Sequence, residues 1–187
     1  MTTLETIRGA LPDYARDLKL NLGMVLTPGG APGLTEQQIW AVALASAIAT
    51  RNTALARDIE AAAGDQLDAA HANAARAAAA IMGMNNIYYR FLHLVEDEEY
   101  KQIPARLRMN FIANPGIDKP TFELLSLAVS AINGCGLCIS SHEKMLRQHE
   151  ITREAIQSSV RIASVINAVA GVLEYEQSGA AAEATAS

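Results

Sequence analysis

The stretch "FELLSLAVSAINGCGLCISSHEK", residues 122–144, indicates how this chain folds. Its first part has apolar side chains at helical spacing, at Phe122, Leu125, Val129 and Ile132. Asn133-Gly134 follows, a pair typical of a helix stop, because glycine readily adopts the left-handed backbone conformation that ends many helices. The next helix is expected to run from about Cys135 to His149. Two helices joined by a tight turn, with no strand beside them, predict an all-α fold.

Helix start signals recur on both sides of this stretch. Thr35 has a glutamine three residues later, at the capping-box position, and predicts a helix that ends near Thr50. Asp68 is expected to cap a long alanine-rich helix, and Thr152 is expected to open the last helix of the chain.

The segment 11–25 admits two interpretations. Residues 18–22 alternate between apolar and polar, as a strand does. Apolar residues also fit one helical face, at Leu11, Tyr14, Leu18, Leu22 and Val25. We expect a helix here.

A faint internal repeat relates the two halves of the chain. Residues 46–60 align without gaps with residues 130–144 and share the Ser-Ala-Ile end of a helix. A duplicated helical unit accounts for this similarity. Only the second copy carries cysteines, with Arg51 and Leu55 near the corresponding places in the first. The first copy is therefore expected to be scaffold, with its Trp40 in the core or at a subunit contact.

The repeat sets the expected domain organisation. We predict a single all-helical domain over residues 1–178, built from related halves at about 35–95 and 119–175. Residues 179–187 are expected to form a disordered tail.

Composition narrows the classes of partner and the compartment. The net charge is −5 and no cluster of Lys and Arg occurs, so nucleic acid and anionic membrane surfaces are poor partners. No uncharged apolar run is long enough to cross a bilayer. The first residues carry charges throughout and no signal-type apolar segment, which favours a cytoplasmic protein.

Both cysteines of the chain lie in the motif Cys135-Gly-Leu-Cys138, with His142 one turn later. Unpaired backbone N–H groups and the positive end of the dipole favour a thiolate at the start of a helix. The spacing along the sequence puts Cys135, Cys138 and His142 on one stripe of that helix. The two thiols can then form a disulfide, and His142 can take a proton from Cys138 or hold its thiolate as an ion pair.

The cysteine motif admits three other interpretations. Cysteines on an apolar helix face are often buried small hydrophobic residues. A structural zinc site needs four ligands, and only Cys135, Cys138 and His142 are local. A thioredoxin-type motif would follow a strand, and no strand is expected nearby. The motif favours a redox centre on an all-helical scaffold, with the structural role and zinc as alternatives.

Several longer segments are similar to one known family. The segments "LPDYARDLKLNL" (11–22), "MGMNNIYYR" (82–90), "RMNFIANPGI" (108–117) and "FELLSLAVSAINGCGLCISSHE" (122–143) resemble the AhpD alkyl hydroperoxidases. That family lies within the carboxymuconolactone decarboxylase-like superfamily. The Cys-x-x-Cys-x-x-x-His segment by itself is enough to indicate the superfamily, and the flanking segments indicate AhpD. The similarity covers nearly the whole chain.

The resemblance implies a fold, an activity and partners. It implies an AhpD-like helical bundle, a homotrimer, and an antioxidant peroxidase that uses thiols to reduce alkyl hydroperoxides. It also implies disulfide exchange that regenerates the peroxiredoxin AhpC. In some relatives electrons arrive through the lipoyl group of a lipoylated acyltransferase and dihydrolipoamide dehydrogenase, so no bound cofactor or metal is expected besides the redox-active Cys135–Cys138 disulfide.

The resemblance also assigns roles to four residues. Cys138 matches the peroxidatic thiol that becomes sulfenic acid. Cys135 matches the proton donor and resolving thiol, and we expect it to exchange with partners because it lies at the helix end. His142 and Glu123 match the proton relay, although Glu123 by itself would be a solvated charge in the first turn of a helix.

One position departs from the family pattern. Well-known AhpD proteins carry a further histidine between the two cysteines, where this chain has Leu137. Peroxidase turnover is then expected to be lower, with disulfide exchange unaffected. Leu137 makes one alternative credible, a pure electron-transfer adaptor between a lipoyl protein and a peroxiredoxin. A non-redox decarboxylase-like enzyme with idle cysteines remains a separate alternative.

Overall fold

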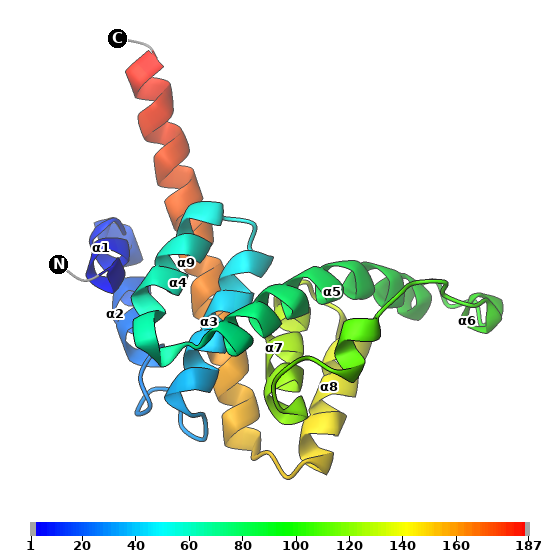
Figure 1. The fold of residues 1–187 in the computed structure, drawn as a ribbon. Coiled ribbons are helices and arrows are strands. Elements are labelled where there is room, and N and C mark those ends of the chain that lie inside the picture. The colour runs from blue at the N-terminus through cyan, green and yellow to red at the C-terminus, as the bar shows by residue number, and fades with distance from the viewer. Residues whose placement is uncertain (1–2, 186–187) are drawn as a thin grey trace.

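The computed structural model describes the backbone of residues 3–185 and the side chains of residues 3–178. Within that range the secondary structure is entirely helical, without a strand (Figure 1). The α-helices are α1 Thr3–Gly9, α2 Arg16–Val25, α3 Glu36–Ala49, α4 Thr53–Ala63, α5 Ala69–Leu94, α6 Glu99–Gln102, α7 Lys119–Ile132, α8 Gly136–Gln148 and α9 Arg153–Thr185. Three 3-10 turns join them: η1 Asp13–Ala15, η2 Gly64–Gln66 and η3 Asn110–Ala113. The predicted all-α fold is confirmed.

Capping residues set the helix starts as the sequence predicted. At α3, Thr35 Oγ1 accepts a hydrogen bond from Gln38 N at 3.2 Å, and Gln38 Oε1 accepts one from Thr35 N at 3.0 Å. This reciprocal box satisfies two N–H groups that a helix start leaves unpaired. The Gln38 amide also donates to Thr121 Oγ1 at 2.9 Å, so the cap ties α3 to the start of α7.

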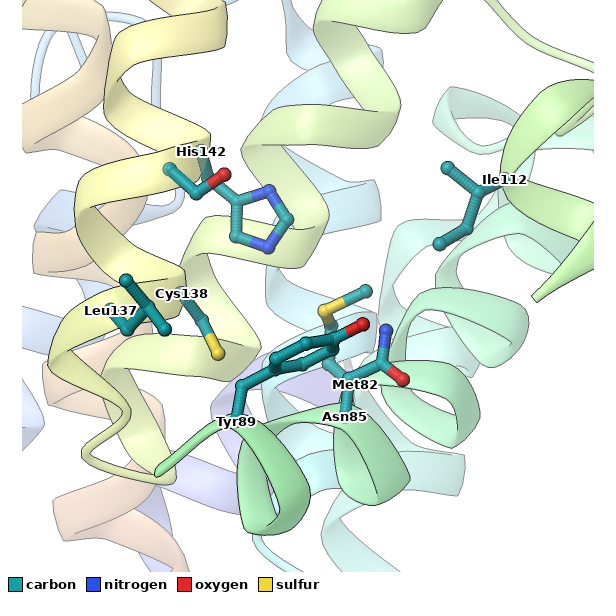
Figure 2. Close-up of a pocket in the computed structure, with 8 residues that line it drawn as sticks. Met82, Asn85, Tyr89, Ile112, Leu137, Cys138 and His142 are labelled. Carbon is teal, nitrogen blue, oxygen red and sulfur yellow. The ribbon is translucent and has the colours of Figure 1, made fainter. Parts of the chain in front are cut away.

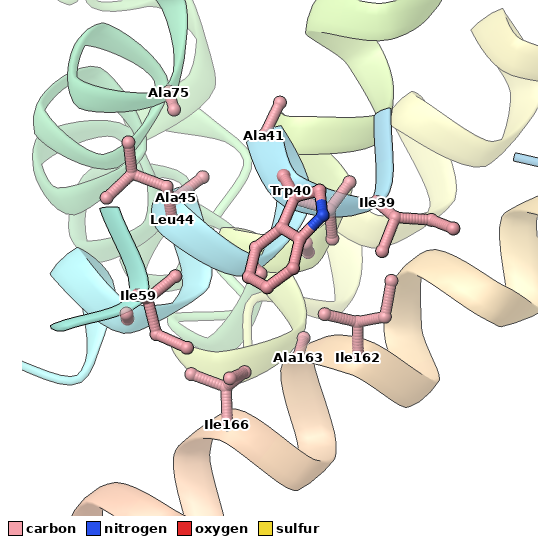
Figure 3. Packing of buried hydrophobic residues seen from close by; sticks show 14 of the residues in the cluster. Ile39, Trp40, Ala41, Leu44, Ala45, Ile59, Ala75, Ile162, Ala163 and Ile166 are labelled. Carbon is pink, nitrogen blue, oxygen red and sulfur yellow. The ribbon is translucent and has the colours of Figure 1, made fainter. Parts of the chain in front are cut away.

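Helix α3 forms the centre of the core and packs against α5, α7 and α9. Its residues from Ile39 to Ala47 are all buried, which identifies a helix surrounded by protein. Trp40 lies inside this cluster (Figure 3), and its indole N–H donates to Gln66 Oε1 at 2.9 Å. Trp40 therefore lies in the core, which was one of the two expected positions, the other being a subunit contact.

The structure contains two successive helix triplets, α3–α4–α5 and α7–α8–α9. The first helices of the two triplets have Thr35 and Asp118 as N-caps, and the second helices have Asn52 and Cys135. The separation along the chain is the same for both pairs, so the caps define a common register between the triplets.

The cap register differs by one position from the sequence alignment around the cysteines. It pairs Asn52 with Cys135 and Leu55 with Cys138, so Arg51 does not correspond to a cysteine. The register of the sequence alignment returns only at the third helices, between the caps Asp68 and Thr152. The sequence alignment missed this because it matched apolar side chains, whereas the turn geometry fixes the equivalent positions.

Both chain ends differ in detail from the sequence expectations. Residues 16–25 are helical as expected, but Tyr14 is exposed and donates to Glu176 Oε1 at 2.8 Å instead of joining the apolar face. Helix α9 continues to Thr185, past residue 179 where we expected a disordered tail to begin. Its last turns are rich in alanine, the strongest helix former. Residues 186–187 lie outside the described range.

Helix α9 is also long and apolar enough, over Arg153–Ser178, to meet the length and composition criteria for a membrane span. A buried core helix meets the same criteria, and 56% of the apolar window in α9 is buried inside the protein. The helix packs along α2, α3 and α7 and acts as a wall of the core.

Candidate functional site: a disulfide at the start of α8

The turn between α7 and α8 places the first cysteine at the start of α8. Asn133 ends α7, and Gly134 follows with φ of 67°, a left-handed value that glycine adopts without strain. The N–H of Cys135 then donates to Ser130 O at 3.1 Å, which closes the turn. Cys135 is the N-cap of α8, and its sulfur accepts a hydrogen bond from Cys138 N at 3.3 Å. The predicted helix stop and helix start are confirmed.

Cys135 and Cys138 are joined as a disulfide, with their Cα atoms 5.3 Å apart. The two residues differ in access: Cys135 is 0% exposed and Cys138 is 7% exposed. The sequence left open which cysteine is more exposed, and in the structure the helix-terminal Cys135 is the less exposed of the two. As an N-cap, Cys135 turns its sulfur back over the first turn of α8, while Cys138, one turn along, faces a cavity.

The structure brings together His142 and Glu123, which lie on different helices. Nδ1 of His142 is 2.6 Å from Oε2 of Glu123, and both side chains are largely buried. A carboxylate can only accept, so this contact places a hydrogen on Nδ1. In a neutral imidazole the other nitrogen, Nε2, is then an acceptor and can serve as a base. Glu123 thus contacts His142 directly, without a bridging group.

The cavity beside Cys138 has a volume of about 400 Å³. It is lined by Met82, Asn85 and Tyr89 from α5, Ile112 from η3, and Leu137, Cys138, Ser141 and His142 from α8. Figure 2 shows the sulfur of Cys138 pointing toward the ring of Tyr89, with the imidazole of His142 reaching into the same space. Leu137 forms part of the wall and is 42% exposed, so the cavity opens beside it. The cavity is mainly apolar, with one cysteine sulfur and a few polar groups.

The histidine and the cysteine pair share this cavity without a mutual hydrogen bond. Among the described residues, His142 bonds to Glu123 and not to the Cys138 sulfur, which is held in the disulfide. The predicted stripe on α8 thus brings Cys138 and His142 to one cavity.

A network of polar side chains on α5 supports the turn before Cys135. The Asn86 amide donates to Ser130 Oγ at 2.9 Å, and the Asn133 amide donates to Asn86 Oδ1 at 3.0 Å. Arg90 donates to the backbone oxygen of Asn133 at 2.6 Å. These bonds fix both the side chain and the carbonyl group of Asn133, the residue that ends α7. They therefore also fix the turn that leads to Cys135.

Sequence reasoning missed the contribution of α5 to this site. Asn85 lines the cavity and Asn86 supports the turn, yet "MGMNNIYYR" contributed only to the family resemblance. A signal was present, because two adjacent asparagines inside an apolar helix have low helix propensity and must find partners when buried. In the described part of the chain, no group of three or more His, Cys, Asp or Glu side chains is arranged to hold a metal ion.

The chemistry available here is that of a dithiol. A vicinal cysteine pair can alternate between two thiols and a disulfide, and a carboxylate–imidazole pair can move the protons involved. The cavity gives a small molecule access to one of the two sulfurs. The site therefore combines a cysteine pair that can form a disulfide, a histidine that can act as a base, and a mainly apolar cavity.

Comparison with known proteins shows which family this chain resembles. Residues 98–176 match the model of the Carboxymuconolactone decarboxylase family. The chain is similar to proteins named "Alkyl hydroperoxide reductase AhpD": 56% identical to that of Coxiella burnetii over 169 residues, covering 90% of this chain and 96% of the relative. It is 53% identical to that of Rhodospirillum centenum over 174 residues, covering 93% and 92%. It is 51% identical to that of Maricaulis maris over 174 residues, covering 93% and 99%.

Proposed function

The chain belongs to the carboxymuconolactone decarboxylase family and, within it, to the AhpD proteins, and we propose that it is an alkyl hydroperoxide reductase that works through Cys135 and Cys138. The observation that carries this proposal is the position of Cys138, which belongs to a disulfide and lines a cavity shared with the Glu123–His142 pair. A peroxidatic thiol needs these features: access for a peroxide, a proton acceptor nearby, and a second thiol within bonding reach.

The first step uses the reduced pair. Oriented by Glu123, the imidazole of His142 accepts the proton of the Cys138 thiol through Nε2. The thiolate attacks the terminal oxygen of the hydroperoxide, so an S–O bond forms and the O–O bond breaks. The alkoxide that leaves takes a proton from His142 or from the thiol of Cys135 and departs as an alcohol. Cys138 is left as sulfenic acid.

The second step closes the disulfide. The sulfur of Cys135 attacks the sulfur of the Cys138 sulfenic acid, and water leaves. The Cα separation of 5.3 Å lies within the usual range for disulfides, so this helix start accommodates the bond. The product is the oxidised form that the structure describes.

A dithiol returns the enzyme to its reduced form by exchange. We propose the lipoyl group of a lipoylated acyltransferase, kept reduced by dihydrolipoamide dehydrogenase, as this donor in the cytoplasm. A lipoyl arm is long, apolar and narrow, which suits a cavity with one accessible sulfur. The reduced pair would in turn regenerate the peroxiredoxin AhpC by reducing its disulfide.

The burial of the two cysteines bears on where exchange begins. Helix position had favoured Cys135 for contact with partners, but Cys135 is fully buried, whereas Cys138 borders the cavity. We therefore propose Cys138 as the sulfur that an incoming thiolate reaches first, with Cys135 as resolving thiol and proton donor.

A second candidate function rests on Leu137. This apolar side chain lies on the cavity wall. In the sequence it stands between the two cysteines, where well-known relatives carry a histidine. A chain lacking that proton-transfer group would suit an adaptor that passes electrons from a lipoyl protein to AhpC with little peroxidase activity. Leu137→His should then raise the peroxide rate and leave exchange with dihydrolipoamide unchanged. An unchanged peroxide rate would remove the argument for the adaptor.

We also propose that the chain assembles as a homotrimer. The C-terminal half of α5, together with α6, projects from the body of the protein (Figure 1). This arm exposes large apolar side chains at Ile87, Phe91, Leu94, Tyr100 and Ile103. Exposed apolar side chains gathered on one segment are typical of interaction surfaces. Light scattering coupled to size-exclusion chromatography tests this directly, with a monomer as the contrary result.

The main proposal is tested by thiol titration and mass spectrometry before and after one equivalent of cumene hydroperoxide. Wild type should lose both thiols and the mass of two hydrogen atoms. Cys135→Ser should gain one oxygen at Cys138, the trapped sulfenic acid. If wild type keeps both thiols yet reduces AhpC after treatment with dihydrolipoamide, the adaptor function is correct. If the double variant Cys135→Ser/Cys138→Ser loses no measurable function, the cysteines are idle and a non-redox activity remains.

A further inference from the structure

Two polar side chains of α5 face the cavity that Cys138 borders. Asn85 and Tyr89 are four residues apart in the helix, so they lie one above the other on one face, and both line the cavity. The Tyr88 ring meets the Tyr89 ring edge to face, with the ring centroids 5.3 Å apart, and so limits how the Tyr89 ring can turn. Figure 2 shows the Tyr89 hydroxyl beside the Asn85 amide, while the Cys138 sulfur lies at the opposite end of the ring. This wall of the cavity therefore has two polar groups away from the sulfur.

The Asn85 amide nitrogen and the Tyr89 hydroxyl are accessible and unpaired. Neither group has a hydrogen-bond partner among the described residues, and neither is enclosed by the surrounding protein. The other end of the Asn85 amide, Oδ1, is enclosed and lies out of reach of a ligand. The neighbouring Asn86 amide, by contrast, is bonded to both Ser130 and Asn133. Because an amide N–H and a phenol O–H both donate, α5 offers two donors to a molecule in the cavity.

The surroundings of the two donors decide the charge of the group that they can bind. None of the residues that line the cavity is a lysine or an arginine, and the carboxylate of Glu123 lies next to His142. A carboxylate ligand would give up its bonds to water here without meeting a cation, which is unfavourable. A neutral carbonyl oxygen loses far less on entering the cavity, and its two lone pairs can accept from both donors at once.

We propose that Asn85 and Tyr89 bind a carbonyl oxygen on the chain of the hydroperoxide substrate, while its O–O–H group reaches Cys138. This inference rests on the proposed peroxidase function and specifies the substrate class: hydroperoxides whose chain carries an ester or ketone group. The apolar part of the chain lies along Met82 and Ile112, which line the same cavity. Such a substrate is held at both ends, whereas a plain alkyl hydroperoxide leaves the two donors of α5 without an acceptor.

The donor pair leaves the bond changes of the reaction as they are. An S–O bond still forms at Cys138, the O–O bond breaks, and His142 or Cys135 still supplies the proton for the leaving alkoxide. The carbonyl group is neither oxidised nor reduced. Because the pair contributes only when the substrate carries an acceptor, its loss should change the preference among hydroperoxides and not the chemistry that they share.

The test measures kcat/KM for three hydroperoxides of similar length: ω-hydroperoxyhexanoic acid, its methyl ester, and octyl hydroperoxide. Wild type should prefer the ester to octyl hydroperoxide and should use the charged acid less well than the ester. Tyr89→Phe keeps the ring and removes the hydroxyl, and Asn85→Leu keeps the size and removes the amide. We expect each variant to lower kcat/KM for the ester about 5- to 10-fold, the usual worth of one hydrogen bond, and to leave octyl hydroperoxide unchanged.

Tyr88→Phe is the matched control, because it removes the hydroxyl of the adjacent tyrosine, which is not among the residues that line the cavity. This variant should keep the preference for the ester. Propanedithiol serves as reductant, because it carries no oxygen that the donor pair could bind, and it should reduce the Cys135–Cys138 disulfide equally fast in all variants. Thermal unfolding verifies that Tyr89→Phe and Asn85→Leu are folded.

Three outcomes would overturn the inference, and they are distinguishable. If wild type consumes none of the hydroperoxides, the proposed function itself fails. If wild type is active without preferring the ester, or if Tyr89→Phe and Asn85→Leu keep that preference, only the role of the donor pair fails. If the two variants lose activity equally on the ester and on octyl hydroperoxide, Asn85 and Tyr89 shape the site and do not recognise a carbonyl group.

Discussion

The two helix triplets use one backbone plan for different purposes. At the N-cap of α4, Asn52 Oδ1 accepts from Leu55 N at 2.9 Å, and its amide donates to Glu174 at 3.1 Å. At the equivalent N-cap of α8, the sulfur of Cys135 accepts from Cys138 N at 3.3 Å. The cap contact is the same, but in the second triplet the capping sulfur also belongs to a disulfide.

The cap register also pairs Glu123 and His142, the proposed proton relay, with core residues of the first triplet. Glu123 corresponds to Trp40, and His142 corresponds to Ile59. Both counterparts are buried in the apolar cluster (Figure 3). Helix α1 packs on α4, whereas the face of α8 that carries His142 borders the cavity. Helices α3 and α4 place these positions in the core, whereas the equivalent helices α7 and α8 place them at a cavity. The difference comes from a few side chains and from the face of α8 that borders the cavity.

The largest expected effect comes from Cys138, whose counterpart Leu55 is inert. Cys138→Ser should lower hydroperoxide consumption by at least about 1000-fold, because a serine hydroxyl is not a nucleophile at neutral pH without strong activation. The assay follows peroxide loss with dihydrolipoamide as reductant. Ser141→Ala, another cavity residue, is the matched control and should stay within about threefold of wild type, as expected for a residue outside the reaction. Activity of Cys138→Ser near that of the control would contradict the peroxidatic assignment.

The next largest effect concerns the relay. The double variant Glu123→Gln/His142→Ile gives α8 the residue that α4 has, and the glutamine avoids a buried unpaired carboxylate. We expect the peroxide rate to fall about 100- to 10,000-fold, the usual range for loss of general acid–base catalysis. Disulfide formation with a strong oxidant should remain, since both thiols are present. A rate within about tenfold of wild type would show that Cys138 is activated by the helix start alone.

A smaller effect is expected when the cap of the first triplet is moved into the second. Cys135→Asn should keep the N-cap bond to Cys138 N, so its Tm should be close to that of reduced wild type. The first equivalent of hydroperoxide should still be consumed, but no disulfide can form and Cys138 should accumulate as sulfenic acid. Cys135→Val, which cannot cap, is the control and should be less stable by about 1 kcal/mol. If the asparagine and valine variants are equally stable, the N-cap hydrogen bond at position 135 does not contribute to stability, and Asn52 and Cys135 are equivalent in geometry only.

These comparisons also explain how much the sequence alone could predict. The starts of α3, α5 and α8, and the stop at Asn133-Gly134, were correct because caps and turns depend on residues within one turn of each other. The spacing of Cys135 and Cys138 likewise sufficed to expect a disulfide. Tyr14 was placed on the buried face of its segment because a helical pattern does not tell which neighbours cover it.

The rest of the site depends on packing between helices. Only the family resemblance connected Glu123 to His142, since nothing local to α7 marks its carboxylate as a partner. That Cys138 faces a cavity also depends on the side chains that α5 places opposite α8, which the sequence does not specify. Asn85 and Asn86 look alike in the sequence and differ only because one faces the cavity and the other faces the turn.

The smallest expected effect compares the caps of the third helices, Asp68 and Thr152. The hydrogen bond from the backbone N–H of His71, and then that from its side chain, lower the pKa of Asp68 below its ordinary value of 3.8. Folding therefore favours the carboxylate, whose contribution is complete above pH 3.8 and is lost as the pH falls through the lowered pKa. The hydroxyl of Thr152 accepts from Ala155 N at 3.1 Å and does not titrate in this range.

Asp68→Ala and Thr152→Ala should each lower the free energy of unfolding by about 1 kcal/mol at neutral pH. Urea unfolding at a fixed protein concentration, repeated from pH 7 downward, measures both penalties. The penalty of Asp68→Ala should shrink once the pH passes below 3.8, while that of Thr152→Ala stays constant. Equal pH dependence of the two would mean that Asp68 caps α5 as a neutral acceptor does, and its charge would then add nothing to the first triplet.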